Sequence, residues 1–168
     1  MPATYEPIAS TTLGSGGSTL VTFSDIPGTF TDLILVSMAD TDYTSAASIS
    51  TYLRINGDTG SNYSTTWLLG SGSAASSSRV SNDTQGIYIG EFSATANLGQ
   101  PSIVQIMSYA NTNVNKTVLS SSCVASSWVT RQVGLWRSTA AITSISVRAG
   151  GYTFQQGGTF SLFGVKAA

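Results

Sequence analysis

The stretch "LRINGDTGSNYS", residues 53–64, is the part of the sequence whose residue types most resemble a site. It places asparagine, aspartate, glycine and serine between two apolar segments, so it could hold a metal ion, contact a ligand or form a turn. A calcium loop of the EF-hand type needs glycine at its sixth position and glutamate at its twelfth. Neither the register that begins at Asp58 nor the one that begins at Asn56 supplies them.

A structural turn fits this stretch better than a metal loop. Asn56-Gly57 can adopt positive φ angles, and the carboxylate of Asp58 can accept hydrogen bonds from nearby backbone amides. We therefore expect a turn over residues 56–62. A cation site of another type and direct ligand contact are the less favoured alternatives.

The chain contains no histidine, which removes the commonest general base and the usual ligand of transition metals. A Ser-His-Asp triad cannot be built, and the motifs S-x-x-K and G-x-S-x-G are absent from the sequence. "GSGGST" (14–19) lacks the lysine of a phosphate-binding loop, so we interpret it as a connection. Asp40 and Asp42 could share a cation, although a solvated loop is favoured. We expect no enzyme, no catalytic residue, no metal site and no cofactor.

The aromatic residues offer a different chemistry, the stacking of flat rings on the apolar face of a sugar. Trp128, Trp67, Tyr63 and Tyr152 are the candidates for such a contact surface. Packing in the core or at a subunit interface is the favoured alternative. Trp136 lies inside an expected strand, so we assign it to the core.

These side chains must be positioned by strands, because the apolar residues recur with a period of two. In 143–149, Ile145 and Val147 alternate with polar residues, which indicates a half-buried strand. Residues 31–38 are apolar on both faces, as in the centre of a sandwich. Strands are also expected at 19–26, 49–55, 65–70, 86–92, 102–109, 116–123, 129–137 and 159–166.

Turn-forming residues separate these segments, which predicts an all-β sandwich or barrel. No domain boundary is evident, so residues 1–168 are expected to form a single β-sandwich domain. In it, 1–18 is an extended N-terminal segment, and 70–86, which includes the polar stretch 72–86, is a long surface loop.

The composition limits the possible partners. Only 9% of the residues are charged and the net charge is −1, without any basic cluster, so nucleic acid is not an expected partner. No apolar run approaches the roughly 18 residues of a membrane span, so no membrane is expected either. The single cysteine, Cys123, excludes an intrachain disulfide and is expected to be a small buried hydrophobe.

Four passages resemble a domain that recurs in virion structural proteins of tailed bacteriophages. They are "ATYEPIASTTLGSGGSTLVTFSDIPGTFTDLILV", "LRINGDTGSNYSTTWLLGSGSAASS", "QIMSYANTNVNKTVLS" with "VGLWRSTAAITSISV", and "FSLFGVKAA". The resemblance implies a jelly-roll-like antiparallel β-sandwich. Domains of this kind occur in head decoration or cement proteins, head fibres and tail-fibre tips, and the family contributes no catalytic residues.

The resemblance begins at Ala3 and continues to the end of the chain, so we expect the domain itself to bind the particle. This favours a decoration or cement protein on the capsid surface, made in the host cytoplasm, that stabilises capsomer contacts of the assembled head. Its expected partners are the major capsid protein and further copies of itself, most simply as a trimer. The alternative is a receptor- or glycan-binding module of a head fibre or a tail-fibre tip.

Overall fold

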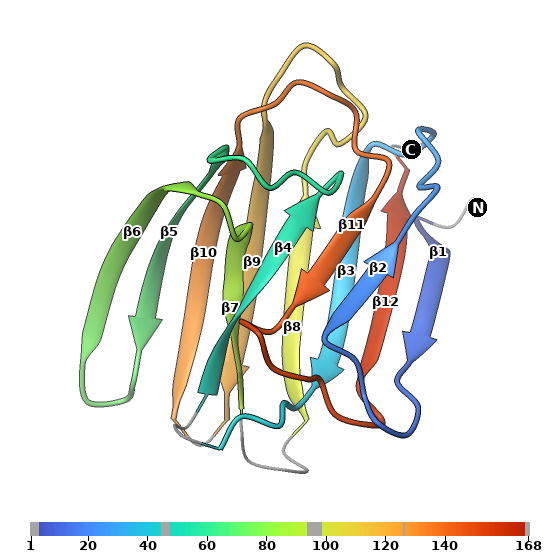
Figure 1. Cartoon of the computed structure of the whole chain (residues 1–168). Coiled ribbons are helices and arrows are strands. Elements are labelled where there is room, and N and C mark those ends of the chain that lie inside the picture. The colour runs from blue at the N-terminus through green and yellow to red at the C-terminus, as the bar shows by residue number, and fades with distance from the viewer. Residues whose placement is uncertain (1–3, 45–47, 94–98, 126, 167–168) are drawn as a thin grey trace.

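The computed structural model describes residues 4–44, 48–93, 99–125 and 127–166. Within these ranges the chain is a single all-β domain, in which two antiparallel sheets pack as a β-sandwich without helices (Figure 1). No helix of these ranges could therefore span a membrane. The strands are β1 (Tyr5–Thr12), β2 (Leu20–Phe23), β3 (Asp32–Ala39), β4 (Ser48–Ile55), β5 (Tyr63–Gly70), β6 (Ala75–Asp83), β7 (Ile87–Ser93), β8 (Gln100–Ile106), β9 (Lys116–Val124), β10 (Trp128–Trp136), β11 (Ile145–Arg148) and β12 (Thr159–Val165).

The strand order is that of a jelly roll. Eight strands pair in a nested way, β1 with β12, β2 with β11, β3 with β8 and β4 with β7. These pairs build two four-stranded arrays, β1-β12-β3-β8 and β2-β11-β4-β7. A hairpin that is folded over on itself produces this nesting, which defines the jelly roll. The predicted jelly-roll-like sandwich is confirmed.

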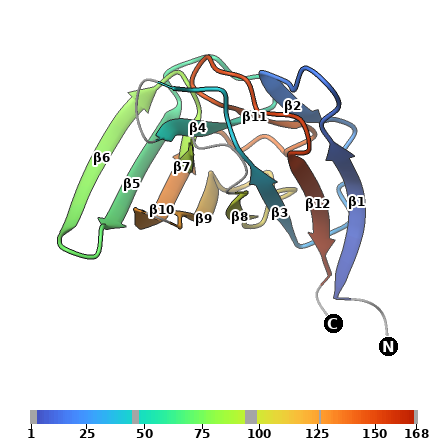
Figure 2. The same ribbon diagram turned by 90° about the horizontal axis from the view of Figure 1, so that it is seen from below.

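Two further hairpins widen one of the sheets. The β9–β10 hairpin joins β8 through β9, and the β5–β6 hairpin joins β10 through β5. The wide sheet therefore has eight strands, in the order β1-β12-β3-β8-β9-β10-β5-β6, and faces a narrow sheet of four. Seen from below, the wide sheet curves around the narrow one, with β6 at one rim and β1 at the other (Figure 2). We call the hairpin β5–β6, residues 63–83, the wing.

Ten strands lie where the period-two pattern predicts them, and two are additional. The prediction of a surface loop over 70–86 is wrong, because β6 occupies residues 75–83. β6 is an edge strand whose side chains are almost all exposed, so it has no apolar alternation to reveal it. β1 lies within the expected extended segment 1–18 and pairs with β12, while residues 1–3 lie outside the described part.

The core lies between the two sheets and follows the predicted alternation. In β11, Ile145 and Val147 are buried, and Trp136 of β10 belongs to the core as expected. The largest fully buried apolar side chains come from both sheets and from the loops at their ends: Tyr63, Tyr109, Phe92, Phe154, Phe160, Leu33, Leu35, Leu53, Ile55, Ile87 and Ile89.

Strand β7 crosses the inner face of β9 and β10 at very short range. A Cβ on Gly134 of β10 would lie 2.2 Å from the Cγ2 atom of Ile87, and one on Gly90 of β7 would lie 1.8 Å from the Oγ atom of Ser122. Only glycine fits at both positions, because any side chain would overlap the opposite sheet. These two glycines therefore allow the narrow sheet to rest on the inserted hairpin.

The inner face of the β9–β10 hairpin beneath β7 is polar rather than apolar. The Oγ atom of Ser120 donates to Oε1 of Gln132 at 2.9 Å, and Nε2 of Gln132 donates to Oγ1 of Thr130 at 2.7 Å. Ser122 and Thr130 share a further hydrogen bond of 2.7 Å between their hydroxyls. These buried groups satisfy one another, which limits the free-energy cost of placing them between two sheets.

The loop after β4 is a turn, as its sequence predicts. Asn56 and Gly57 have φ angles of 49° and 66°, and the amide of Gly60 donates to Oδ1 of Asp58 at 2.8 Å. The calcium-loop alternative required oxygen ligands that converge on an ion, whereas here the Asp58 carboxylate is occupied by donors of the protein itself.

The same loop ties the two sheets together. The indole Nε1 of Trp136 and the amide Nδ2 of Asn62 donate to Oδ2 of Asp58, at 2.7 and 2.9 Å. Burial raises the pKa of Asp58, but these two hydrogen bonds and that of the Gly60 amide lower it by more. The pKa of Asp58 therefore lies below its ordinary value. Oδ1 of Asn56 accepts a hydrogen bond from the amide of Thr143 at 2.9 Å, which fixes the segment that leads into β11.

Tyr63 places its hydroxyl inside this loop. The hydroxyl accepts the amide of Ile55 at 3.2 Å and lies 3.1 Å from the carbonyl oxygen of Asp58, to which it can donate. The side chain is fully buried, and this burial raises its pKa to about 12.

The substitution Gly134→Ala tests the close approach of the sheets. We expect it to lower the free energy of unfolding by about 1–3 kcal/mol, because β7 has to move away from β10. Gly28→Ala is the matched control, since a Cβ there meets nothing within 4 Å, and it should change stability by less than about 0.5 kcal/mol. Urea denaturation measures both, and equal stability of the two variants would contradict the packing described.

The substitution Tyr63→Phe tests the buried hydroxyl through the pH dependence of stability. Between pH 10, where the phenol of the unfolded chain loses its proton, and about pH 12, the folded state retains the proton, so stability falls as pH rises. For two pKa units the loss approaches about 2.7 kcal/mol. Tyr63→Phe should cost about 1–2 kcal/mol at pH 7 but show a shallower decline above pH 10, measured as urea midpoints. Identical slopes in both proteins would contradict this role.

Candidate binding sites

The four aromatic residues predicted as a contact surface do not form one. Tyr63 is fully buried beneath the loop 56–62, so its assignment to a contact surface is wrong. Tyr152 is 38% exposed and packs against Tyr43, with ring centroids 4.5 Å apart. Trp67 and Trp128 are partly exposed, but they line different cavities. A single flat platform of these rings is therefore absent from the described structure.

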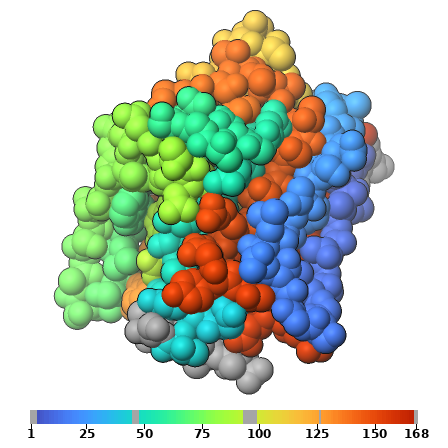
Figure 3. All heavy atoms as spheres, viewed as in Figure 1, coloured from blue at the N-terminus to red at the C-terminus, as the bar shows by residue number. Residues whose placement is uncertain are grey.

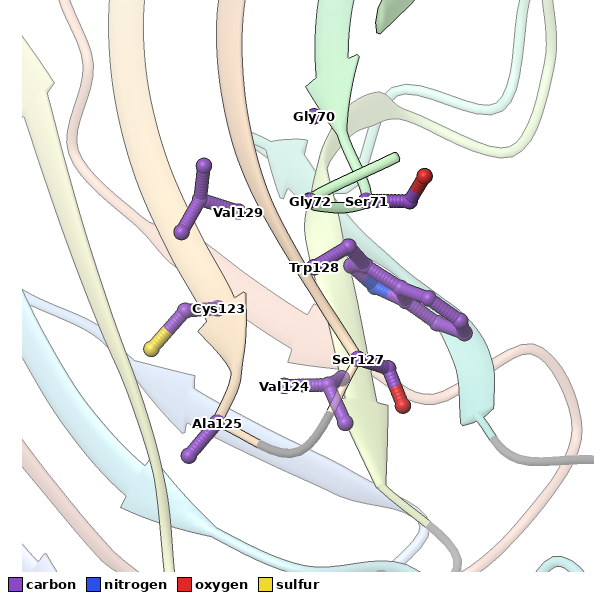
Figure 4. A pocket seen from close by; sticks show the side chains of 9 residues that line it. All are labelled: Gly70, Ser71, Gly72, Cys123, Val124, Ala125, Ser127, Trp128 and Val129. Atoms are coloured by element: carbon purple, nitrogen blue, oxygen red, sulfur yellow. The ribbon is translucent and has the colours of Figure 1, made fainter. Parts of the chain in front are cut away.

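Trp128 lies at the end of the β9–β10 hairpin, as the first residue of β10, and lines a depression of about 410 Å³ (Figure 4). Figure 4 shows its indole pointing away from Cys123 and Val129, which are cross-strand neighbours. The indole Nε1 is buried without a partner among the described residues. Cys123 is partly exposed rather than buried, which corrects the expectation from its sequence.

Trp67 belongs to a more enclosed cleft between the wing and the edge of the narrow sheet. The space-filling view shows the surface hollowed between the green atoms of the wing and the blue-green atoms of β4 (Figure 3). The cleft has a volume of about 230 Å³ and is lined by Ser50, Tyr52, Trp67, Val80, Asp83, Tyr88 and Glu91. Alternation along β5 turns Trp67 inward, toward β7, and a bulge between Thr51 and Tyr52 shifts the register of β4 against β7.

Three aromatic rings form the wall of this cleft. The ring centroids of Trp67 and Tyr88 are 5.1 Å apart and their planes make an angle of 59°. Those of Tyr52 and Tyr88 are 6.2 Å apart, at 61°. The rings are thus inclined to one another, and they line one cleft without presenting a single flat surface.

Two carboxylates complete the lining. Glu91 Oε2 accepts a hydrogen bond from Ser48, and Asp83 Oδ1 accepts the amide of Gln85 at 2.8 Å. Burial raises the pKa of the Tyr88 hydroxyl, and the nearby negative charge of Glu91 raises it further, so this phenol stays neutral.

A second feature is the outer surface of the wide sheet, which we call the convex face. It consists of the outward side chains of β3, β8, β9, β10 and β5. Seven large apolar residues of these strands are clearly exposed: Val36, Met38, Leu68, Ile103, Leu119, Val129 and Val133. They form neighbouring pairs across strands, such as Val36 with Ile103 and Leu119 with Val133. The apolar pattern of 31–38 therefore does not mean burial on both sides, since Met38 is 52% exposed.

The convex face carries little charge. Asp32 at one end of β3 and Arg131 near the centre are the charged side chains at these outward positions, and Arg79 follows on the wing. Arg131 and Leu68 line a groove of about 350 Å³. Neither arginine makes an ion pair with a described residue, whereas Lys166 Nζ pairs with Glu6 Oε1 at 2.8 Å elsewhere.

Asp40 and Asp42, the possible cation pair of the sequence, both bind backbone amides. Asp40 Oδ1 accepts the amide of Gly99 at 3.0 Å, and Asp42 Oδ1 accepts the amide of Thr153 at 2.8 Å. In the described ranges no three His, Cys, Asp or Glu side chains gather in a way that could hold a metal ion.

Sequence reasoning found Trp67 but missed the rest of its cleft. Tyr52, Asp83, Tyr88 and Glu91 come from three strands, and no motif in the sequence connects them. The one pattern in the sequence that points to the cleft is the two-residue alternation of 86–92, which places Tyr88 and the buried Ile87 on opposite faces of the strand.

No family model and no curated protein matches this chain. The bacteriophage resemblance of the sequence therefore stays a hypothesis.

Proposed function

We propose that this chain is a capsid decoration or cement protein of a tailed bacteriophage, which docks on the assembled head through its convex face and stabilises capsomer contacts. The observation that carries the proposal is the exposed apolar surface of the wide sheet. Large contiguous apolar patches are rare on soluble monomers and mark sites of interaction.

The dimensions of the wide sheet suit a protein–protein interface. The five strands of the convex face, spaced by about 4.8 Å and each about seven residues long with a rise of about 3.3 Å, span roughly 550 Å². Each partner in a standard interface buries about 800 Å². The convex face can therefore supply most of such an interface without a change of shape, and the flanking strands of the wide sheet extend it.

The chemistry of this face favours a neutral partner surface. The face exposes seven apolar side chains and carries Arg131 near its centre, so binding would remove apolar area from water and involve few ion pairs. Such contacts depend weakly on salt, because screening acts on charges. Several copies of the face, bound at symmetric positions of a shell, would also reinforce one another. The homo-oligomer, most simply a trimer, is part of this proposal.

The alternative, a receptor- or glycan-binding module, receives less support. It rested on a platform of Trp128, Trp67, Tyr63 and Tyr152, and the described structure separates these residues. Enzymatic function also receives no support from the arrangement of the polar groups described above, so the proposed role is mechanical.

The substitution Val133→Lys tests the role of the convex face. Val133 is 52% exposed on this face. Val114→Lys is the matched control, because Val114 is 44% exposed but lies in the loop before β9. With heads assembled without the protein, Val133→Lys should reduce co-sedimentation at least tenfold, whereas Val114→Lys should bind like the parent protein. Equal binding of both variants would reject the convex face as the docking surface.

A second experiment tests the function itself. Heads that lack the protein should assemble but release DNA at lower temperature or after osmotic shock, and added protein should restore them at low salt and in about 1 M salt alike. Heads that keep their full stability without the protein but no longer adsorb to host cells would overturn the decoration proposal and support receptor binding.

A further inference from the structure

We propose that the cleft between the wing and the narrow sheet binds an organic ammonium ion, with a quaternary ammonium group as the best fit. This cleft lies on the opposite side of β5 from the convex face, since Trp67 projects from the inner side of β5 while Leu68 projects from the outer side, although Trp67 also borders the groove beside Leu68 and Arg131. The proposal therefore does not depend on the decoration function.

The geometry of the rings favours a cation over a sugar. A sugar stacks on one flat ring face or on coplanar rings, whereas Trp67, Tyr88 and Tyr52 are inclined by about 60° to their neighbours. All three residues line the same cleft, so a ligand there would meet aromatic surface from more than one direction. This arrangement attracts a cation, and it is how proteins recognise quaternary ammonium groups.

The charges around the cleft also favour a cation. Asp83 and Glu91 contribute two carboxylates to the lining, which contains no basic side chain. Neither carboxylate pairs with a cationic side chain of the described chain. Arg79, the arginine nearest to Asp83 in sequence, pairs with Thr66 and projects from the outer side of the wing. Arg54 uses Nη2 to donate to the carbonyl oxygens of Thr84 and Gln85, at 3.2 and 3.3 Å, and Arg148 lies beside Tyr52 without lining the cleft.

The hydrogen bonds of the lining leave the carboxylates able to act on a ligand. Ser48 binds Oε2 of Glu91, and the amide of Gln85 binds Oδ1 of Asp83. These contacts hold the carboxylates in place without neutralising them. An ammonium ion in the cleft would thus meet ring faces and two fixed negative charges, and a quaternary group needs no hydrogen-bond acceptor beyond them.

The test uses the folded full chain labelled with ¹⁵N and follows the three indole N–H resonances, one for each tryptophan. Trp67→Phe assigns the resonance of Trp67. Choline is the probe, and 3,3-dimethylbutan-1-ol, in which carbon replaces the charged nitrogen, is its neutral isostere. We expect choline to shift the Trp67 resonance saturably, and the isostere to bind at least tenfold more weakly.

Charge-neutralising variants identify the groups responsible. Glu91→Gln and Asp83→Asn should each weaken choline binding at least threefold, whereas Asp25→Asn, which removes the same charge from the connection between β2 and β3, should leave it unchanged. If the Glu91→Gln variant unfolds because its contact with Ser48 is lost, the Asp83→Asn variant still tests the proposal. The proposal is overturned if choline and its isostere bind equally, if a panel of sugars shifts Trp67 and choline does not, or if choline gives no shift at about 50 mM.

Discussion

The close approach of β7 to β9 and β10 is the constraint on which the rest of the structure depends. A jelly roll closes with eight strands, and here four more extend one of its sheets. The extension is possible because Gly90 and Gly134 let the narrow sheet rest on the inserted hairpin, and because the polar groups trapped there bind one another. Once β9–β10 is in place, β10 offers an edge to β5, and the wing follows. Both the broad convex face and the cleft under the wing result from this one contact.

The scarcity of charge has opposite effects inside and outside the molecule. Inside, the buried ammonium group of Lys116 donates to the carbonyl oxygens of Asn111, Val114 and Thr139 at 2.6 to 3.0 Å, and burial lowers its pKa. This cation binds loops together without a carboxylate. Outside, the convex face has so few charges that its apolar residues dominate it. The molecule therefore uses its few ionic groups to fix loops and the cleft, and leaves the largest surface neutral.

The sequence was sufficient to predict the class of fold, because alternation reports directly which face of a strand is buried. It could not identify β6, since the serines of an edge strand give no such signal. Nor could it separate Tyr63 from Trp67. Both project from the inner side of β5, but the narrow sheet and its loop cover Tyr63 and end before Trp67. Exposure at such positions depends on where the opposite sheet stops, which is a property of strand pairing between distant segments. The same holds for the cleft, whose residues meet only because β4, β5, β6 and β7 converge.

The nested pairing of the jelly roll also governs how the chain reaches its native state. Tyr5 pairs with Val165 and Thr12 with Thr159, so the outermost strands of the nest join positions separated by almost the whole chain. Contacts of this kind require the closure of very long loops before any free energy is gained, and proteins dominated by them fold slowly. The hairpins β5–β6 and β9–β10 are local in comparison and can form early. We therefore expect the added hairpins that enlarge the binding surfaces to form early in folding, and the pairing of β1 with β12 to form late.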